Sequence, residues 1–157
     1  MARAPFQVLV LPYRAAANGD YEFAVFSRSD DDCWQGIAGG GETGETPLQA
    51  AQREAEEEAG IREDALFLPL DSVASVPVTC FRDSYLWGEH VYVIPEYAFG
   101  VDATGTPIVV SGEHREFRWM TFSQAECLLK YDSNRVALWE LNLKIRNLGP
   151  RDRHSYG

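Results

Sequence analysis

Short apolar runs separated by turn signals occupy the N-terminal part of the chain. Residues 6–13 (FQVLVLPY) and residues 21–27 (YEFAVFS) are apolar or alternate between apolar and polar positions, which is typical of β-strands. Residues 17–20 (ANGD) lie between them and form a strong hairpin turn signal. We predict a short third strand at residues 34–38. A flexible loop is predicted next, with Gly39, Gly40, Gly41 and Gly44.

The following segment carries complete start and stop signals for a helix. Thr46 is a good N-cap, and Pro47 suits the first helical position. Gln49 completes a capping box with Thr46. Gly60 stands where a glycine commonly ends a helix. We therefore predict a helix from Pro47 to Ala59.

The remainder of the chain shows further strand patterns and then two helical patterns. Strand-like stretches are present at residues 66–71, 73–79, 90–99, 107–111 and 115–120. Residues 123–131 and 133–148 predict helices, because apolar residues in the second segment recur at helical spacing. This order predicts an α/β (α+β) fold in which a mixed β-sheet is sandwiched between helices. We expect one domain over residues 1–149 and a polar C-terminal tail over residues 150–157.

Charge and hydropathy narrow the class of partner. The formal net charge is −10 at pH 7. An acidic surface repels polyanions, which disfavours a nucleic acid polymer as a partner. The apolar run at residues 6–11 is too short for a membrane span or for the hydrophobic part of a signal peptide. We therefore expect a cytoplasmic protein without a membrane partner, either a monomer or a homodimer.

Cysteines and acidic residues give different indications about metals. Cys33, Cys80 and Cys127 are scattered and form no CxxC pair, which indicates reduced thiols rather than a disulfide framework or a zinc site. Six of the 24 acidic residues fall between Glu42 and Glu58. Such a local concentration of carboxylates suggests a cation site, and a bound cation could recruit an anionic substrate.

Three glutamates share one face of the predicted helix: Glu54, Glu57 and Glu58. Mutual repulsion within such a cluster raises its pKa values, and a hard divalent cation relieves that cost. Ligand sets made only of oxygen atoms select Mg²⁺ or Mn²⁺ over zinc. For these three residues taken alone, the alternative is an acidic helix face turned to water.

The surrounding segment is far more specific than the glutamates alone. Residues 39–61 (GGGETGETPLQAAQREAEEEAGI) resemble the Nudix box GX5EX7REUXEEXGU, in which U is an apolar residue. Every position fits, and at typical residue usages seven fixed residues coincide by chance roughly once in 10⁸ starting points. The resemblance implies the Nudix fold and a hydrolase that acts on acid anhydrides in phosphorus-containing substrates.

The resemblance also implies a ligand set for Mg²⁺, for which Mn²⁺ can substitute. These ligands are Glu54, Glu57, Glu58 and the carbonyl oxygen of Gly39. Arg53 lies four residues before Glu57 and can also reach back toward Glu45. We interpret Arg53 as a residue that orients carboxylates in catalysis, and a plain surface ion pair is the alternative.

A second acidic segment supplies another candidate. Residues 113–119 (EHREFRW) resemble the ExxxxxW segment found further along many Nudix hydrolases. Glu113 is therefore a candidate for an additional metal ligand or for the general base. Glu116 competes for that role, and a structural or solvated carboxylate is the alternative interpretation of Glu113.

Further stretches resemble one branch of the family, the bacterial dihydroneopterin triphosphate pyrophosphatases, also described as dATP pyrophosphohydrolases. Residues 34–39 (WQGIAG) are similar to the FWQxxTG segment of that branch. Residues 113–114 (EH), Trp119 and residues 133–135 (SNR) are similar to its EH, W and SNR positions. Departures from the branch pattern occur at Ser27, Cys33 and Ala38.

The branch resemblance suggests contacts to a flat ring and to a triphosphate. Trp34 could stack on a purine or pterin ring, with core packing as the alternative. Arg28 and Arg3 could donate charge-assisted hydrogen bonds to terminal phosphates, or lie on a solvated surface. Ser133 could donate to phosphate at the N-terminus of the last helix, or simply cap that helix.

Together these resemblances imply a Mg²⁺-dependent pyrophosphohydrolase. Its substrate would be a small nucleoside-triphosphate-like molecule, of the dihydroneopterin triphosphate or dATP type, cleaved to a monophosphate and pyrophosphate. Within the family, the alternatives are hydrolases of oxidised nucleotides, dinucleoside polyphosphates or RNA 5′ ends. A non-catalytic ligand sensor with the Nudix fold is a further alternative. Such sensors commonly lose box glutamates, and this chain keeps all of them.

Overall fold

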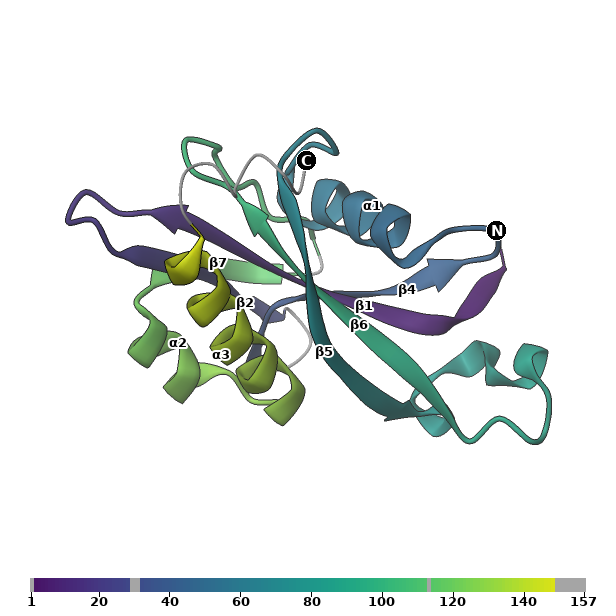
Figure 1. Ribbon diagram of the computed structural model, residues 1–157. Coiled ribbons are helices and arrows are strands. Elements are labelled where there is room, and N and C mark those ends of the chain that lie inside the picture. The colour runs from purple at the N-terminus through teal and green to yellow at the C-terminus, as the bar shows by residue number, and fades with distance from the viewer. Residues whose placement is uncertain (1, 29–31, 113, 149–157) are drawn as a thin grey trace.

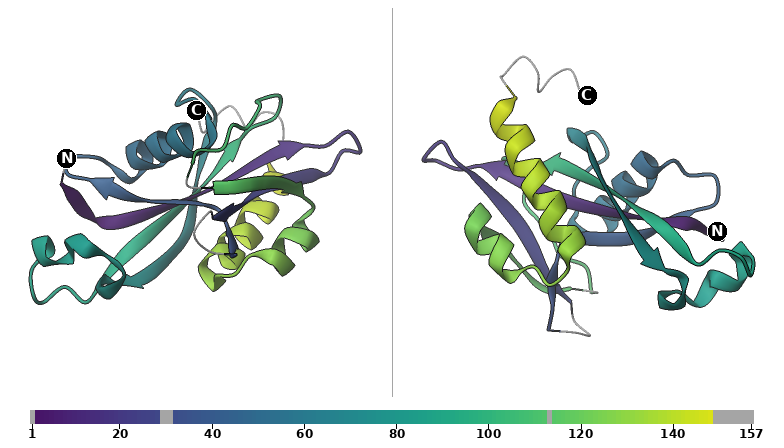
Figure 2. Two further views of the ribbon diagram at one scale, coloured as in Figure 1. Left: turned by 180° about the vertical axis from the view of Figure 1, so that it is seen from behind. Right: turned by 60° about the horizontal axis from the view of Figure 1, so that its bottom comes forward.

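The computed structural model describes residues 2–28, 32–112 and 114–148, and shows a twisted mixed sheet between two helical layers (Figure 1). The strands are β1 (Arg3–Ala15), β2 (Tyr21–Arg28), β3 (Trp34–Gln35), β4 (Ile37–Glu42), β5 (Phe67–Pro77), β6 (Val93–Asp102) and β7 (His114–Met120). The helices are α1 (Pro47–Ala59), α2 (Phe122–Leu128) and α3 (Asp132–Asn147), with short 3₁₀ helices η1 (Val78–Cys80) and η2 (Arg82–Trp87). Helix α1 covers one face of the sheet, and α2 and α3 cover the other (Figures 1 and 2). The predicted fold class is confirmed.

Strand β1 is the centre of the sheet, because both of its edges are paired. One edge runs parallel to β6, with Gln7 opposite Glu96 and Tyr13 opposite Asp102. The other edge is antiparallel to β4 along its first part and to β2 at its end. Strand β5 extends the sheet beyond β6, while β3 and β7 pair with β2. The sheet therefore joins segments from the whole length of the chain.

Alternation along β1 divides the apolar side chains between two cores. Val8 and Val10 belong to the core under α1, whereas Leu9 and Leu11 belong to the core under α2 and α3. Helix α1 contributes only small side chains to its core: Ala50, Ala51, Ala55 and Ala59. Because alanines allow close packing, the acidic residues beside them are held near strand β4.

The predicted helix Pro47–Ala59 is confirmed, and the flexible glycine loop predicted before it is corrected. The hydroxyl of Thr46 accepts a hydrogen bond from the Gln49 N–H, and the Gln49 side chain completes the capping box. Gly39, Gly40 and Gly41 are part of strand β4 and not a flexible loop. They pair with β1, where Gly39 lies opposite Val8.

Two further strand predictions are corrected. The stretches at 66–71 and 73–79 form one strand, β5, with a register shift between Pro69 and Val73. Residues 107–111 form no strand. Their N–H groups instead satisfy carbonyls in the last turn of α1, since Val109 donates to Ala59 at 3.0 Å and Ser111 donates to Glu58 at 3.2 Å.

Two expectations from the composition concern the cysteines and a membrane-spanning segment. All three cysteines are thiols; Cys33 is buried, and Cys80 and Cys127 are exposed. Across residues 2–28, 32–112 and 114–148, no helix is long and apolar enough to span a membrane. The predicted tail at residues 150–157 lies outside the described residues.

Candidate active site

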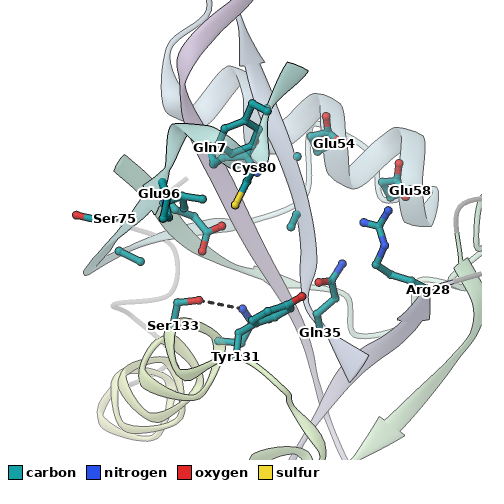
Figure 3. Close-up of a pocket in the computed structure, with 18 of the residues that line it drawn as sticks. Gln7, Arg28, Gln35, Glu54, Glu58, Ser75, Cys80, Glu96, Tyr131 and Ser133 are labelled. Carbon is teal, nitrogen blue, oxygen red and sulfur yellow. Dashed lines mark hydrogen bonds between the residues drawn. The ribbon is translucent and has the colours of Figure 1, made fainter. Parts of the chain in front are cut away.

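A cleft of about 780 Å³ lies between the C-terminal half of α1, strand β4 and the N-terminus of α3. The residues singled out in the sequence that line it are Arg3, Arg28, Gly39, Glu54, Glu57, Glu58 and Ser133. Figure 3 shows Arg28 beside Glu58 at one end of the cleft, and Glu96 facing Ser133 at the other. The fold therefore brings residues from both ends of the chain into one site.

Helix α1 presents three of its four glutamates to the cleft at different depths. Glu54 and Glu58 are buried, with 8% and 6% of their surface exposed. The side chain of Glu57 is 56% exposed. Gly60 ends the helix in the left-handed conformation, with φ 68°, and its N–H caps the carbonyls of the last turn. This fixed end keeps Glu57 and Glu58 at the cleft.

The carboxylate of Glu54 lies against the backbone of β4 at Gly39. A Cβ atom at Gly39 would lie 2.1 Å from Cδ of Glu54, so only glycine leaves room for this contact. Burial raises the pKa of Glu54 to about 7, although a hydrogen bond from Arg53 opposes the shift. The charges of Glu57 and Glu58 raise it further. A bound cation would stabilise the ionised form of this carboxylate.

Arg53 connects the loop before α1 to the acidic face of the helix. Its Nε and Nη2 donate to both oxygens of Glu45, at 2.8 and 3.0 Å. Its Nη1 donates to Glu54 at 3.0 Å and to Glu57 at 3.4 Å, and Nη2 also donates to the Gly40 carbonyl at 2.8 Å. The contacts of Arg53 with Glu45 and Glu57 that the sequence predicted are therefore present.

Glu58 is held by two residues from outside α1. Nε2 of His114 lies 2.8 Å from Oε2 of Glu58, and the Ser111 hydroxyl donates to the same oxygen at 3.0 Å. The ring of His114 packs on Phe26, with the ring centroids 5.2 Å apart. In the sequence His114 was only part of a branch similarity, and its contact with Glu58 was not predicted.

The ligand set fits Mg²⁺ or Mn²⁺ by donor type, because carboxylates and the Gly39 carbonyl offer oxygen atoms alone. Glu54 also lies beside Gly39, the residue whose carbonyl is the fourth candidate ligand. Among the described residues, however, no three carboxylate, imidazole or thiol groups are arranged to hold a metal ion. Glu54 and Glu58 are turned toward Arg53 and His114 instead.

Two guanidinium groups add positive charge to the acidic cleft. Arg3 lies over the backbone of β4, where a Cβ at Gly40 would be 2.1 Å from its Nε. Its Nη2 donates to Gln7 at 3.2 Å, and its guanidinium lies 5.3 Å from the centroid of the Phe81 ring. Arg28 reaches the cleft from the end of β2. Both arginines are therefore placed where a phosphate chain could meet them.

Trp34, for which ring stacking and core packing were the two interpretations, lies at the edge of a core. Trp34 is not among the described residues that line the cleft. Its side chain packs against the core under α2 and α3, and the guanidinium of Arg118 lies 4.9 Å from the centroid of its ring. The alternative given for this residue, core packing, describes its position. Glu113 lies outside the described residues, and its competitor Glu116 is exposed and paired with Arg118 at 3.4 Å.

Sequence reasoning missed one acidic residue of the cleft, Glu96 on strand β6. Figure 3 shows Ser133, at the N-terminus of α3, facing this carboxylate, and its hydroxyl lowers the pKa of Glu96. The signal that could have found it was a glutamate inside the otherwise apolar segment IPEYAFGV. Charged side chains are rarely buried in such strands unless they have a partner or a function.

The chain belongs to the NUDIX domain family, whose sequence profile matches residues 10–139. It is 33% identical over 140 residues to the dihydroneopterin triphosphate diphosphatase of Escherichia coli K12, an alignment that covers 87% of this chain and 91% of that enzyme. The chain is accordingly a Nudix hydrolase that acts on acid anhydrides in phosphorus-containing substrates.

Solved structures agree with this assignment. A crystal structure described as a NUDIX hydrolase of Listeria monocytogenes is similar with a TM-score of 0.83 and 41% identity, covering 95% of this chain and 97% of the other. The E. coli dihydroneopterin triphosphate pyrophosphohydrolase is similar with a TM-score of 0.73 and 27% identity, covering 92% of this chain and 99% of the other. The predicted Nudix fold is confirmed.

Proposed function

We propose that the chain is a Mg²⁺-dependent pyrophosphohydrolase that converts dihydroneopterin triphosphate, or a purine deoxynucleoside triphosphate, to a monophosphate and pyrophosphate. One observation carries the proposal: the three box glutamates Glu54, Glu57 and Glu58 line the same cleft as Arg3 and Arg28. The similarity to the E. coli diphosphatase over most of the chain supports this choice of substrate.

The box residues divide the work of holding a cation and orienting its ligands. When bound, Mg²⁺ neutralises charge on the leaving pyrophosphate and lowers the pKa of a water molecule. Glu54, Glu57 and Glu58 would hold it with the Gly39 carbonyl. Arg53 orients carboxylates in this arrangement, because it donates hydrogen bonds to both Glu54 and Glu57.

The arginines of the cleft act on the substrate. Arg3 and Arg28 bind phosphate oxygens through charge-assisted hydrogen bonds, which fix the chain of phosphates along the acidic face of α1. Their positive charges also offset the repulsion between the substrate and the glutamates. Since phosphoryl-type transition states need mostly positioning and charge stabilisation, these two functions account for most of what the protein must supply.

The proton acceptor for the attacking water is a carboxylate. Glu113 is our candidate from the sequence for this base, or for an additional metal ligand. It lies outside the described residues, so its role rests on the similarity of residues 113–119 to the family segment.

A substrate comparison tests the proposal. Purified protein with Mg²⁺ is assayed against dihydroneopterin triphosphate, dATP, dGTP, 8-oxo-dGTP, diadenosine polyphosphates, ADP-ribose and triphosphorylated RNA. We expect the highest kcat/KM for dihydroneopterin triphosphate. A tenfold or greater preference for any of the last four substrates would refute the proposed substrate class and leave the Nudix hydrolase assignment unchanged.

A further inference from the structure

Glu96 is a charged residue at a position where the strand pattern expects an apolar one. Two residues further along the same face of β6, Ala98 belongs to the core under α2 and α3. Glu96 instead faces the cleft, between Gln7 of β1 and Ala74 of β5 in the register of the sheet. A carboxylate in the middle of a sheet is costly unless its hydrogen-bonding capacity is used.

A chain of hydrogen bonds fixes one partner of Glu96. The N–H of Gly36 donates to Oδ1 of Asn134 at 2.7 Å, so the Asn134 side chain has one orientation. Its Nδ2 then donates to the Ser133 hydroxyl at 3.3 Å. Since the Ser133 oxygen accepts from Asn134, its own proton can point toward Glu96, which Ser133 faces in Figure 3 and whose pKa its hydroxyl lowers. Glu96 is thereby held in place as an acceptor.

The position of Glu96 suits the ring end of a substrate. It lies across the cleft from Glu58 and Arg28, as Figure 3 shows, so a triphosphate bound at α1 would direct its ring toward β6. Phe81 and Tyr131 line the same cleft and offer aromatic faces for a flat ring. Burial raises the pKa of Glu96, while the Ser133 hydrogen bond lowers it. Donor groups on a ligand would replace the hydration that burial removes.

We propose that Glu96 is a specificity-determining residue that accepts two hydrogen bonds from a 2-amino-4-oxo-pyrimidine edge, the edge shared by pterins and guanine. This inference rests on the proposed function. A carboxylate has room for about four hydrogen bonds, so the neighbouring Ser133 hydroxyl leaves acceptor capacity for a ligand. The ring N–H and the neighbouring 2-amino group of a pterin or a guanine are adjacent donors, which match its two oxygens.

The same chemistry disfavours adenine. Each edge of adenine that carries the 6-amino donor also carries a ring nitrogen acceptor beside it. That acceptor would face a carboxylate oxygen, and the like partial charges would repel. A site built to receive two donors rejects a ring that lacks one of them, because its buried acceptor is then left without a partner. Ser133 acts as a positioning residue for Glu96 in this arrangement.

The test uses a series of nucleotides that removes the ring donors one at a time. Dihydroneopterin triphosphate and dGTP have both donors, dITP lacks the amino group, and dATP lacks the matching pair. Wild type, Glu96→Gln and Ser133→Ala are compared with Glu126→Gln, which removes an exposed carboxylate from α2. The steady-state kcat/KM with Mg²⁺ is measured for each combination of protein variant and substrate, and thermal melting checks that each variant is folded.

We expect wild type to prefer dGTP over dITP and dITP over dATP. Glu96→Gln should lower kcat/KM for dihydroneopterin triphosphate and dGTP about 10-fold or more, chiefly through KM, and leave dATP within about twofold. Ser133→Ala should lower kcat/KM for the same substrates by a smaller factor, and Glu126→Gln should leave kcat/KM unchanged. A wild-type preference for dATP, or an equal fall for all substrates in Glu96→Gln, would overturn the proposal.

Binding without turnover separates this inference from the proposed function. Affinities for dGTP and dATP are measured by calorimetry with Ca²⁺ in place of Mg²⁺, for wild type and Glu96→Gln. If wild type hydrolyses none of these triphosphates, the proposed function fails. Even then, the role of Glu96 is supported if wild type binds dGTP more tightly than dATP and Glu96→Gln abolishes this difference. Equal binding of the two nucleotides by wild type contradicts it.

Discussion

Nε2 of His114 lies 2.8 Å from Oε2 of Glu58, and the two side chains are only 3% and 8% exposed. The pair joins the first residue of β7 to the last turn of α1, so a strand far along the chain sets the orientation of a box glutamate. A buried hydrogen bond to a charged group contributes more than an exposed one, because water does not compete for the carboxylate.

Replacing His114 should therefore weaken the proposed metal site without unfolding the protein. We expect His114→Leu to lower kcat about 10-fold or more and to raise the Mg²⁺ concentration needed for half-maximal activity, as loss of a residue that orients a metal ligand does. His114→Gln, which keeps a donor near the same place, should retain more activity. His90→Leu is the matched control, because the His90 side chain is 87% exposed. Wild-type Mg²⁺ dependence in His114→Leu would contradict the positioning role.

The box glutamates should be distinguishable from an acidic neighbour on the same helix. Glu57→Gln and Glu58→Gln each remove the charge of a proposed metal ligand, and we expect kcat to fall about 10²-fold or more while the protein stays folded. Glu56→Gln provides the control, since Glu56 is exposed and is not among the residues that line the cleft. Equal rates for the three variants would show that the acidic face of α1 only faces water.

The pair Glu113 and Glu116 tests the assignment made from the ExxxxxW segment. If Glu113 is a ligand or base, Glu113→Gln should reduce kcat more than it raises KM, because its contribution is made in the transition state. The same change at Glu116, which is paired with the exposed Arg118, should have a milder effect. Near-wild-type kinetics for both variants would remove Glu113 from the catalytic site.

Glu140 gives a prediction about stability and pH. It accepts hydrogen bonds from the N–H groups of Asp71 at 2.6 Å and Ser72 at 2.8 Å, and lies 2.9 Å from Nζ of Lys144. Burial raises its pKa, but the hydrogen bonds from Asp71, Lys144 and Ser72 outweigh burial and lower the pKa to about 2. Because this is below the ordinary value of 4.5, the stabilisation is complete above pH 4.5 and is lost as the pH falls toward 2.

Urea unfolding of wild type and Glu140→Gln measures this contribution. We expect the variant to be less stable by about 2 kcal/mol at pH 7, with the difference shrinking between pH 4.5 and pH 2. Glu126→Gln should show no such pH-dependent difference. A stability difference that is constant from pH 7 to pH 2.5 would mean that Glu140 contributes through packing and not through its charge.

Signals that act within a few residues were sufficient to predict α1. Thr46, Pro47 and Gln49 specify its start, and Gly60 its end, through contacts made inside the helix and its caps. The placement of Glu54 and Glu57 on one face follows from helical spacing in the same way. Helix capping and helical spacing were therefore sufficient to predict the acidic half of the cleft.

Contacts between distant segments explain what was missed. The low strand propensity of Gly40 suggested a loop, yet Gly40 lies in β4, paired with Gln7 of β1, and Arg3 packs where its side chain would be. Glu96 and His114 reach the cleft through the pairing of β6 with β1 and of β7 with β2. No spacing along the chain reports such long-range strand pairing. The same holds for Trp34, whose neighbours are Leu129, directly after α2, and Arg118 of β7.

The identity of the products, and their dependence on a metal, test the proposed chemistry most directly. Dihydroneopterin triphosphate and Mg²⁺ are incubated with the protein, and ³¹P NMR follows the phosphorus-containing products, with and without excess EDTA. We predict a monophosphate and pyrophosphate in equal amounts, no turnover in EDTA, and recovery when Mg²⁺ is restored. Release of orthophosphate from the triphosphate, or undiminished hydrolysis in excess EDTA, would contradict a Mg²⁺-dependent pyrophosphohydrolase.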